Sequence, residues 1–269
     1  MLHVPASPIL STSPNETTAG LEKTAPLQEI FSSIQGEALY VGKRQVFVRF
    51  AHCHLKCAYC DTPMISTTGQ CHVEDPPGSG LQFYYPNPMQ PQTLIEIISA
   101  LLKQAKHHSV SFTGGEPLLY HAFLRNVLPQ IRQLAPIYLE TSGTQADFLE
   151  AVLPWLDYIA MDIKLPSATQ EANQFENHAR FYESALKNLE TQCFVKVVFN
   201  ENTTQEELNA IKTIVTRRNT PIILQPETSL GDRKVYIHPK RLFEIETDLA
   251  AHFDDVRVIP QTHKMLNVL

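Results

Sequence analysis

The chain has 269 residues, a formal net charge of −6 and 43% hydrophobic residues. This length suits one α/β barrel or two small domains, and we expect a single domain. No run approaches the roughly 20 apolar residues of a membrane span, and no basic stripe is present for nucleic acid. We therefore expect a soluble protein that binds neither membranes nor nucleic acids.

The chain begins with residues 1–26, which are rich in Ser, Thr, Pro and Asn and show almost no hydrophobic periodicity. This composition predicts a disordered arm. The arm lacks the basic and apolar regions of a signal peptide, so no leader is expected. The folded domain is predicted to span residues 27–269, with its first clear strand at residues 45–50, where Val46 and Val48 alternate with other residues.

Three of the five cysteines follow this strand with the spacing C-x3-C-x2-C: Cys53, Cys57 and Cys60. Few cysteines, with three in one cluster, argue against a disulfide framework and for a reducing compartment, the cytoplasm. Thiolates this close in sequence can converge on one soft metal centre. Three ligands leave one position open, as on a [4Fe-4S] cluster whose fourth iron stays free for a small molecule.

Zinc is the alternative metal, with His52, His54 or His72 as a fourth ligand. Structural zinc sites pair two C-x2-C or C/H groups, however, and no second group follows at a suitable spacing. The sequence therefore favours iron and sulfur over zinc.

The rest of the chain is predicted to alternate strands and helices. Residues 63–92 are rich in proline and aromatic residues, which suggests a partly ordered insertion rather than a core element. A helix follows behind a capping box of Thr93 and Glu96. Strands are predicted at 109–113, 137–140, 158–163, 194–199, 221–224 and 256–259, separated by helical patterns such as 204–217 and 239–252. Repeated β-α order predicts an α/β fold with a parallel sheet, either an open doubly wound sheet or a partial barrel.

Polar groups recur where these strands end, which is where α/β proteins gather their chemistry. Residues 113–117 read Thr-Gly-Gly-Glu-Pro, and two glycines let the backbone approach a ligand closely, although a tight turn is the plain alternative. Residues 140–144, 162–164 and 225–228 end later strands. Asp162 and Lys164 also suit a simple salt bridge. Their common position favours one shared site.

The cysteine spacing, ending in an aromatic-Cys pair, and the G-G-E-P loop one β-α unit later resemble the radical S-adenosylmethionine (SAM) superfamily. Residues 27–269 closely resemble one family in it, the 7-carboxy-7-deazaguanine synthases of the queuosine and 7-deazapurine pathway. The resemblance rests on the loop 29–37, the strand 47–49, the turn 60–62 and the tail 261–269. It implies a partial (β/α)6-type TIM-like barrel with an insertion at 63–92.

The resemblance also implies an activity, the conversion of 6-carboxy-5,6,7,8-tetrahydropterin to 7-carboxy-7-deazaguanine with loss of ammonia. A reduced [4Fe-4S] cluster would cleave SAM to a 5′-deoxyadenosyl radical, which takes a hydrogen from the pterin substrate and later returns it. SAM then acts as a cofactor, and no side chain is assigned as catalytic. Mg²⁺, a homodimer and an external electron donor such as flavodoxin or ferredoxin are implied as well.

Residue roles follow from the same resemblance. The implied substrate contacts are Ile34, Gln35, Gly36, Glu37, Arg49, Thr113, His263 and Leu269. The implied SAM contacts are Tyr59, Cys60, Asp61, Gly115, Glu116, Ser142, Asp162, Ile163, Lys164, Gln225, Pro226, Glu227 and Thr228. The cluster ligands are Cys53, Cys57 and Cys60, and Thr62 is the implied Mg²⁺ ligand.

This chain departs from the family's pattern at three places: Tyr59 stands for a frequent tryptophan, Asp162-Ile163 for Ser-Pro, and Ala38 for a frequent glycine. Another radical SAM enzyme, such as a glycyl-radical-enzyme activase, would share the cysteines and the G-G-E-P loop but not the Gln-Gly-Glu loop and the tail. A zinc-stabilised binding module would be colourless, whereas an iron-sulfur protein is brown.

We predict that Cys53, Cys57 and Cys60 alone hold the cluster, because each thiolate is an iron ligand. Replacing any one of them with Ala should abolish activity and reduce the iron content measured after anaerobic reconstitution. Cys71→Ala and Cys193→Ala are the controls and should leave both properties intact. Loss of the cluster in Cys71→Ala would refute the three-cysteine assignment.

Overall fold

The computed structural model describes residues 24–62, 69–266 and 268. The described residues form one ten-stranded sheet with the order β10-β9-β8-β7-β6-β5-β2-β1-β3-β4. The strands are β1 (Leu27–Ile34), β2 (Arg44–Phe50), β3 (Gln70–Glu74), β4 (Gln82–Pro86), β5 (Ser109–Gly114), β6 (Ile137–Thr141), β7 (Tyr158–Ile163), β8 (Gln192–Phe199), β9 (Ile222–Pro226) and β10 (Val256–Val258). Every strand predicted from residue 45 onward is present, with ends shifted by a few residues.

Short and long helices connect these strands. They are α1 (Pro91–Gln104), α2 (His121–Ile131), α3 (Ala146–Glu150), α4 (Pro166–Thr169), α5 (Phe175–Ala185), α6 (Gln205–Ile214), α7 (Pro239–Ala250) and α8 (Thr262–Leu266), with 3-10 turns η2 (Ala38–Tyr40), η3 (Pro117–Tyr120) and η4 (Leu153–Trp155). Within the described part of the chain, no helix is long and apolar enough to cross a membrane.

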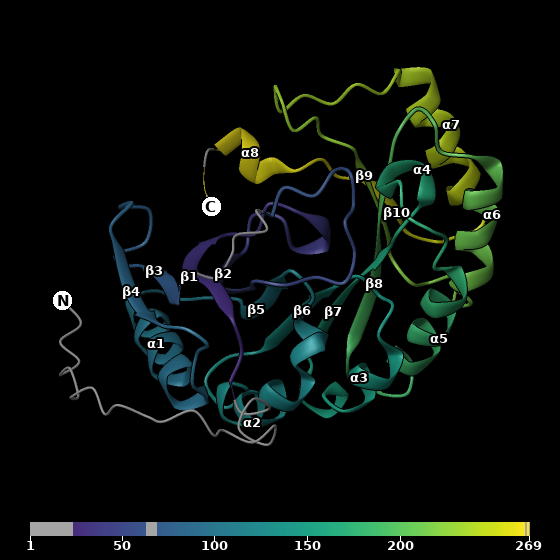
Figure 1. The fold of residues 1–269 in the computed structure, drawn as a ribbon. Coiled ribbons are helices and arrows are strands. Elements are labelled where there is room, and N and C mark those ends of the chain that lie inside the picture. Colours follow the sequence, from purple (N-terminus) through teal and green to yellow (C-terminus); the bar gives the residue numbers. More distant parts are fainter. Residues whose placement is uncertain (1–23, 63–68, 267, 269) are drawn as a thin grey trace.

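The strand order decides between the two architectures that the sequence allows. Strands β2 and β5 to β10 are parallel and follow one another in chain order without reversal. A doubly wound sheet needs a reversal to place helices on both faces, whereas crossovers of one hand and one direction keep all helices on one face. Figure 1 shows α1, α2, α3, α5, α6 and α7 in an arc outside the strands, with α8 on the other side. The partial barrel is confirmed.

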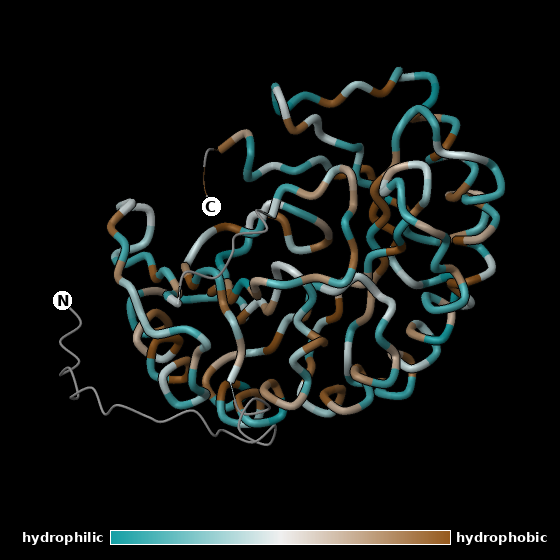
Figure 2. The backbone as a smooth tube through the Cα atoms, in the orientation of Figure 1, coloured by the Kyte–Doolittle hydropathy of each residue, from teal (hydrophilic) through white to brown (hydrophobic). Residues whose placement is uncertain are grey.

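The outer helices are held by apolar faces that pack on the sheet. In α1, Leu94, Ile98 and Leu101 are fully buried. Figure 2 shows hydrophobic and hydrophilic residues alternating along the outer helices. The helix begins at Pro91 without a side-chain cap, so the predicted capping box at Thr93 is wrong. Proline suits the first helical position, where its missing N–H is not needed.

The predicted insertion contributes to the core. Residues 63–68 lie outside the described residues, but β3 and β4 extend the sheet beyond β1. Cys71, Val73 and Met89 are fully buried. Met89 also forms a β-bridge with Ala25, so the fold includes a residue of the expected N-terminal arm. Pro76, Pro77, Gly78 and Gly80 lie in the turn between β3 and β4, and each strand is too short for its two-residue period to be recognised.

A small apolar cluster fills the inner face of the barrel beneath η2. Ala38 lies there against Tyr138, Ala160, Phe194 and Ile223. Its φ is 57°, in the left-handed region, and its side chain is buried. This conformation explains why glycine suits the position, and the Cβ of alanine costs about 1–2 kcal/mol there.

We predict that two substitutions at Ala38 differ in their effect on the free energy of unfolding. Ala38→Val should lower the free energy of unfolding by about 2–4 kcal/mol, because a β-branched residue at positive φ is strained and overpacks the cluster. Ala38→Gly should be nearly neutral, since relief of about 1 kcal/mol of strain offsets the loss of one buried methyl group. Urea unfolding compares the three proteins, and equal stability of the two variants would contradict the backbone assignment.

Candidate functional site

Two adjoining cavities open at the carboxyl ends of the parallel strands. The cysteine cavity, with a volume of about 570 Å³, is lined by Cys53, Cys57, Cys60, Tyr59, Ser142, Lys164, Lys196 and Gln225 among others. The tail cavity, of about 700 Å³, is lined by Ile34, Gln35, Gly36, Arg233, His263 and Val268 among others. Six residues line both cavities: Glu37, Arg49, Cys60, Asp61, Thr113 and Glu140. Volumes of this size suit small molecules.

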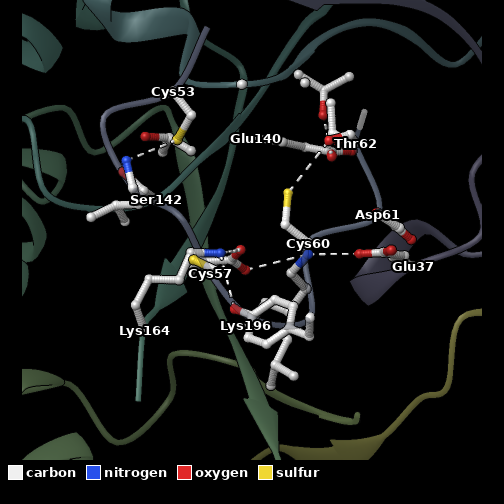
Figure 3. A pocket seen from close by; sticks show the side chains of 18 of the residues that line it. Glu37, Cys53, Cys57, Cys60, Asp61, Thr62, Glu140, Ser142, Lys164 and Lys196 are labelled. Carbon is white, nitrogen blue, oxygen red and sulfur yellow. Dashed lines mark hydrogen bonds and ion pairs between the residues drawn. The ribbon is translucent and has the colours of Figure 1, made fainter. Parts of the chain in front are cut away.

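The three clustered cysteines lie around one hollow in the cysteine cavity (Figure 3). The loop turns tightly, with the Cys60 N–H donating to the Cys57 carbonyl at 3.0 Å. Burial raises the pKa of the Cys53 and Cys57 thiols, so binding a metal centre as thiolates would release protons. Within the described residues, no three His, Cys, Asp or Glu side chains converge on a site for a single metal ion.

The histidines named as zinc ligands lie elsewhere. His54 Nε2 is 2.9 Å from Thr144 Oγ1, and His72 packs edge-on against Tyr84 on β3 and β4. Neither of them, nor His52, lines the cavity of the three cysteines. The structure therefore brings together three thiols without a histidine.

The glycine pair of the G-G-E-P loop allows that loop to pack on the cysteine loop. A Cβ on Gly115 would lie 2.0 Å from the His52 carbonyl oxygen, and one on Gly114 would lie 2.4 Å from Cγ of Arg49. Backbone bonds join the same segments, with the Glu116 N–H donating to the His52 carbonyl at 2.8 Å. The sequence predicts that these glycines lie in close contact with a ligand. In the structure they allow the G-G-E-P loop to lie close to the cysteine loop and to β2.

Glu116 lies beneath the cysteine cavity, and it is fully buried. Its carboxylate accepts hydrogen bonds from Thr141 Oγ1 at 2.8 Å, and from Ser142 N and Oγ at 2.7 and 2.6 Å. Ser142 lines the cavity, whereas Glu116 does not. Glu116 therefore holds Ser142 in place at the cavity wall.

Other predicted SAM contacts divide between the cavity and the core. Gln225 and Thr228 line the cysteine cavity, and the buried Gln225 Oε1 has no hydrogen-bond partner among the described residues. Such an orphaned acceptor fits a polar ligand in the cavity. Ile163 and Pro226 are buried outside the cavity lining, and Glu227 instead accepts a hydrogen bond from Asn200 Nδ2 at 2.7 Å.

A chain of polar contacts runs around the cavity wall from Tyr59, which precedes Cys60, to Asp61, which follows it. This polar ring consists of Tyr59, Lys164, Asp162, Lys196, Glu37, Gln261 and Asp61. The successive contacts measure 3.2, 2.6, 3.3, 2.6, 2.7 and 3.2 Å. Figure 3 shows Lys164 and Lys196 on one side of the cysteines and Glu37 with Asp61 on another. The predicted Asp162–Lys164 salt bridge is confirmed as one link.

Four charges of the ring alternate in sign and are largely buried, those of Glu37, Lys196, Asp162 and Lys164, whereas Asp61 is exposed. Burial disfavours ionisation of Glu37, yet Lys196, Gln261 and the more distant His263 together lower its pKa to about 2. Burial likewise opposes the charge on Lys196, but Asp162 and Glu37 raise the pKa of that lysine. Lys264 adds a further cation, 2.8 Å from Asp61. The cavities thus have permanently charged walls at neutral pH.

The tail cavity joins the N-terminal loop to the C-terminal tail. The Thr262 N–H donates to the Gly36 carbonyl at 2.8 Å, and a Cβ on Gly36 would lie 2.3 Å from His263 Cβ. Glycine at this position therefore lets the tail lie directly on the loop. The predicted contact at Leu269 lies outside the described residues.

Arg49 lines both cavities from the end of β2. Its Nε donates to Glu29 Oε1 at 2.7 Å, and its guanidinium lies over the Phe31 ring. Thr113 and Gln35 instead brace a half-buried carboxylate, because Thr113 Oγ1 and Gln35 Nε2 donate to Glu140 at 2.7 and 2.8 Å.

Three residues of the site escaped the sequence analysis. Lys196 and Gln261 belong to the polar ring, and the fully buried His178 accepts from the Lys164 N–H at 3.0 Å while its Nδ1 contacts the Gly143 carbonyl at 2.8 Å. A lone lysine within the apolar strand 194–199 was the available signal for Lys196, since a buried charge needs a partner. Nothing in the sequence marks His178.

Comparison with known proteins supports the family resemblance that the sequence motifs indicate. The model of the Radical SAM superfamily matches residues 47–193. The 7-carboxy-7-deazaguanine synthase of Geobacter sulfurreducens is 37% identical over 249 residues, covering 91% of this chain and 98% of that relative. The enzyme of the same name from Methanocaldococcus jannaschii is 34% identical, covering 90% and 100%.

Solved structures are similar in fold. QueE from Escherichia coli has a TM-score of 0.52 at 17% identity and covers 93% of this chain and all of that chain. A radical SAM methyltransferase from Sphaerobacter thermophilus has a TM-score of 0.55 at 12% identity, covering 82% and 67%.

We predict that His178 makes the fold less stable as the pH falls. Burial lowers its pKa to about 4 from the ordinary 6.5, so the unfolded chain binds more protons between these values. The free energy of unfolding should therefore drop by about 1–2 kcal/mol from about pH 7 to about pH 5 through this residue alone. Urea unfolding of the wild type and of His178→Gln isolates the effect, and an equal drop in both proteins would disprove it.

Proposed function

The chain belongs to the radical SAM superfamily and, within it, to the 7-carboxy-7-deazaguanine synthases, and from this premise we propose how its two cavities serve that reaction. The protein converts 6-carboxy-5,6,7,8-tetrahydropterin to 7-carboxy-7-deazaguanine with loss of ammonia. The cysteine cavity takes the cofactors and the tail cavity takes the pterin. The observation that carries this proposal is the wall of six residues that the two cavities share.

The cysteine cavity fits a [4Fe-4S] cluster with SAM. Its three thiols supply the cluster ligands and leave one iron free, and its polar wall suits a zwitterionic ligand. When bound, cluster and SAM supply the 5′-deoxyadenosyl radical that removes a hydrogen atom from the substrate. Tyr59, Ser142 and Lys164 hold SAM in this proposal, together with Gln225, whose buried oxygen is free to accept a hydrogen bond.

The tail cavity fits a flat, polar pterin that carries a carboxylate. Arg49 bonds Glu29 through Nε, so its two terminal nitrogens are available for bidentate contact with that carboxylate. Gly36 and His263 line the same cavity. Because Arg49 also borders the cysteine cavity, it would hold the substrate next to the site of radical formation.

Further parts of the proposal rest on family membership. Mg²⁺ binds at Thr62, which lines the cysteine cavity and offers the hard oxygen that this ion prefers. Leu269 contacts the substrate. The protein acts in the cytoplasm as a homodimer and receives its electrons from flavodoxin or ferredoxin.

The alternative functions are not favoured. A glycyl-radical-enzyme activase gives no role to the tail, yet Gln261 and Thr262 contact Glu37 and Gly36 of the N-terminal loop. A zinc-stabilised binding module gives no role to the charged double cavity beside the three cysteines.

The anaerobic reaction tests the function directly. Reconstituted protein with the carboxytetrahydropterin, SAM, Mg²⁺ and a reductant should form 7-carboxy-7-deazaguanine, detected by liquid chromatography and mass spectrometry. Arg49→Gln should raise KM for the pterin about tenfold to a hundredfold, as expected for loss of a charge-assisted bond worth about 1.5–3 kcal/mol. Formation of 5′-deoxyadenosine without the deazaguanine product would refute the assignment.

The Mg²⁺ site gives a separate prediction. Thr62→Val keeps the shape but removes the ligand oxygen, so product formation should fall while the iron content stays normal. Thr62→Ser keeps the hydroxyl and serves as the control with retained Mg²⁺ stimulation. If Mg²⁺ stimulated Thr62→Val as strongly as the wild type, the site would lie elsewhere.

A further inference from the structure

One lysine connects the walls of the two cavities. Lys196 Nζ lies 2.6 Å from Glu37 Oε2 and 3.3 Å from Asp162 Oδ1, with only 13% of its side chain exposed. Glu37 follows the loop under the tail, and Asp162 lies beside Lys196 on the neighbouring strand β7. The lysine therefore joins a carboxylate that lines both cavities to one that lines only the cysteine cavity.

The C-terminal tail docks on the residue that Lys196 holds. Glu37 Oε1 accepts a hydrogen bond from Gln261 Nε2 at 2.7 Å. Next to it, the N–H and the hydroxyl of Thr262 both donate to the Gly36 carbonyl, at 2.8 and 3.1 Å. A displaced Glu37 would take away the shorter of the two carboxylate contacts of Gln261 Nε2, since the one to Asp61 measures 3.2 Å, and would disturb the backbone that Thr262 binds.

We propose that Lys196 is a positioning residue that keeps the tail docked over the tail cavity and Lys164 turned toward the cysteine cavity. It acts through Glu37 on one side and through Asp162 on the other, and it needs no contact with the substrate. This inference rests on the proposed function, because only a reaction between ligands in both cavities requires their walls to be held in one geometry.

Charge balance explains why a lysine is needed there. Glu37 and Asp162 reach Lys196 from two sides, and Asp162 Oδ2 is already paired with Lys164 at 2.6 Å. Without Lys196, two largely buried carboxylates would face one another with too little positive charge between them, which is unfavourable where little water is available to solvate them. Glu37 would then turn toward solvent, and the tail would lose one of its anchors.

Hydrogen exchange at the Thr262 amide tests this without any turnover. In the cluster-loaded protein, Lys196→Met should speed this exchange about tenfold or more, because loss of a charge-assisted contact favours local opening. Lys196→Arg keeps the charge and should restore most of the protection. Lys212→Met breaks an ion pair of 2.6 Å with Asp248 on the outer helices and should leave Thr262 unchanged. Unaltered exchange in Lys196→Met, or an equal effect of Lys212→Met, would overturn the proposal.

A second variant tests the proposal if Lys196→Met does not fold, and kinetics provide a second measurement. If Lys196→Met does not fold, Glu37→Gln removes the same ion pair from the other side and should also speed exchange at Thr262; unchanged exchange there would overturn the proposal. In active protein, Lys196→Met should raise KM for the pterin more than it lowers kcat, with rescue by Lys196→Arg. Faster exchange in a protein that makes no deazaguanine would refute the proposed function and leave the tail-docking role of Lys196 standing.

Discussion

The site depends on one buried alternation of charge, in which Glu37, Lys196, Asp162 and Lys164 follow one another across the barrel mouth. Each charge is costly to bury alone, and each is offset by its neighbours. The alternation ties an N-terminal loop to strands β7 and β8, and Gln261 extends it to the tail. Parts of the chain more than two hundred residues apart thereby become one wall.

Close backbone approach is the second constraint. Gly115 lies so near the cysteine loop, and Gly36 so near His263, that a Cβ would clash at either position. Both glycines belong to motifs that look like ligand loops in the sequence. In the fold, the two glycines let neighbouring chain segments pack closely. The cavities form between these packed segments.

The sequence predicted seven of the ten strands, because apolar runs of four to six residues between helical patterns have few other interpretations. It also predicted the carboxyl-end location of the site, since Thr113, Ser142 and Gln225 lie at or just after the ends of strands. It did not predict β1, nor β3 and β4, whose alternation is brief, nor the roles of His178 and Lys196. Those roles arise from contacts between residues far apart in the chain, such as Lys196 with Glu37, which periodicity and local motifs cannot reveal.

The most direct test is a crystal structure of the cluster-loaded protein with SAM and the carboxytetrahydropterin bound. This account predicts the pterin in the tail cavity with its carboxylate on the Arg49 guanidinium, and SAM beside Ser142 and Gln225 in the cysteine cavity. The shared wall at Glu37 would separate them. A pterin bound away from Arg49, or SAM in the tail cavity, would contradict the division of the two cavities.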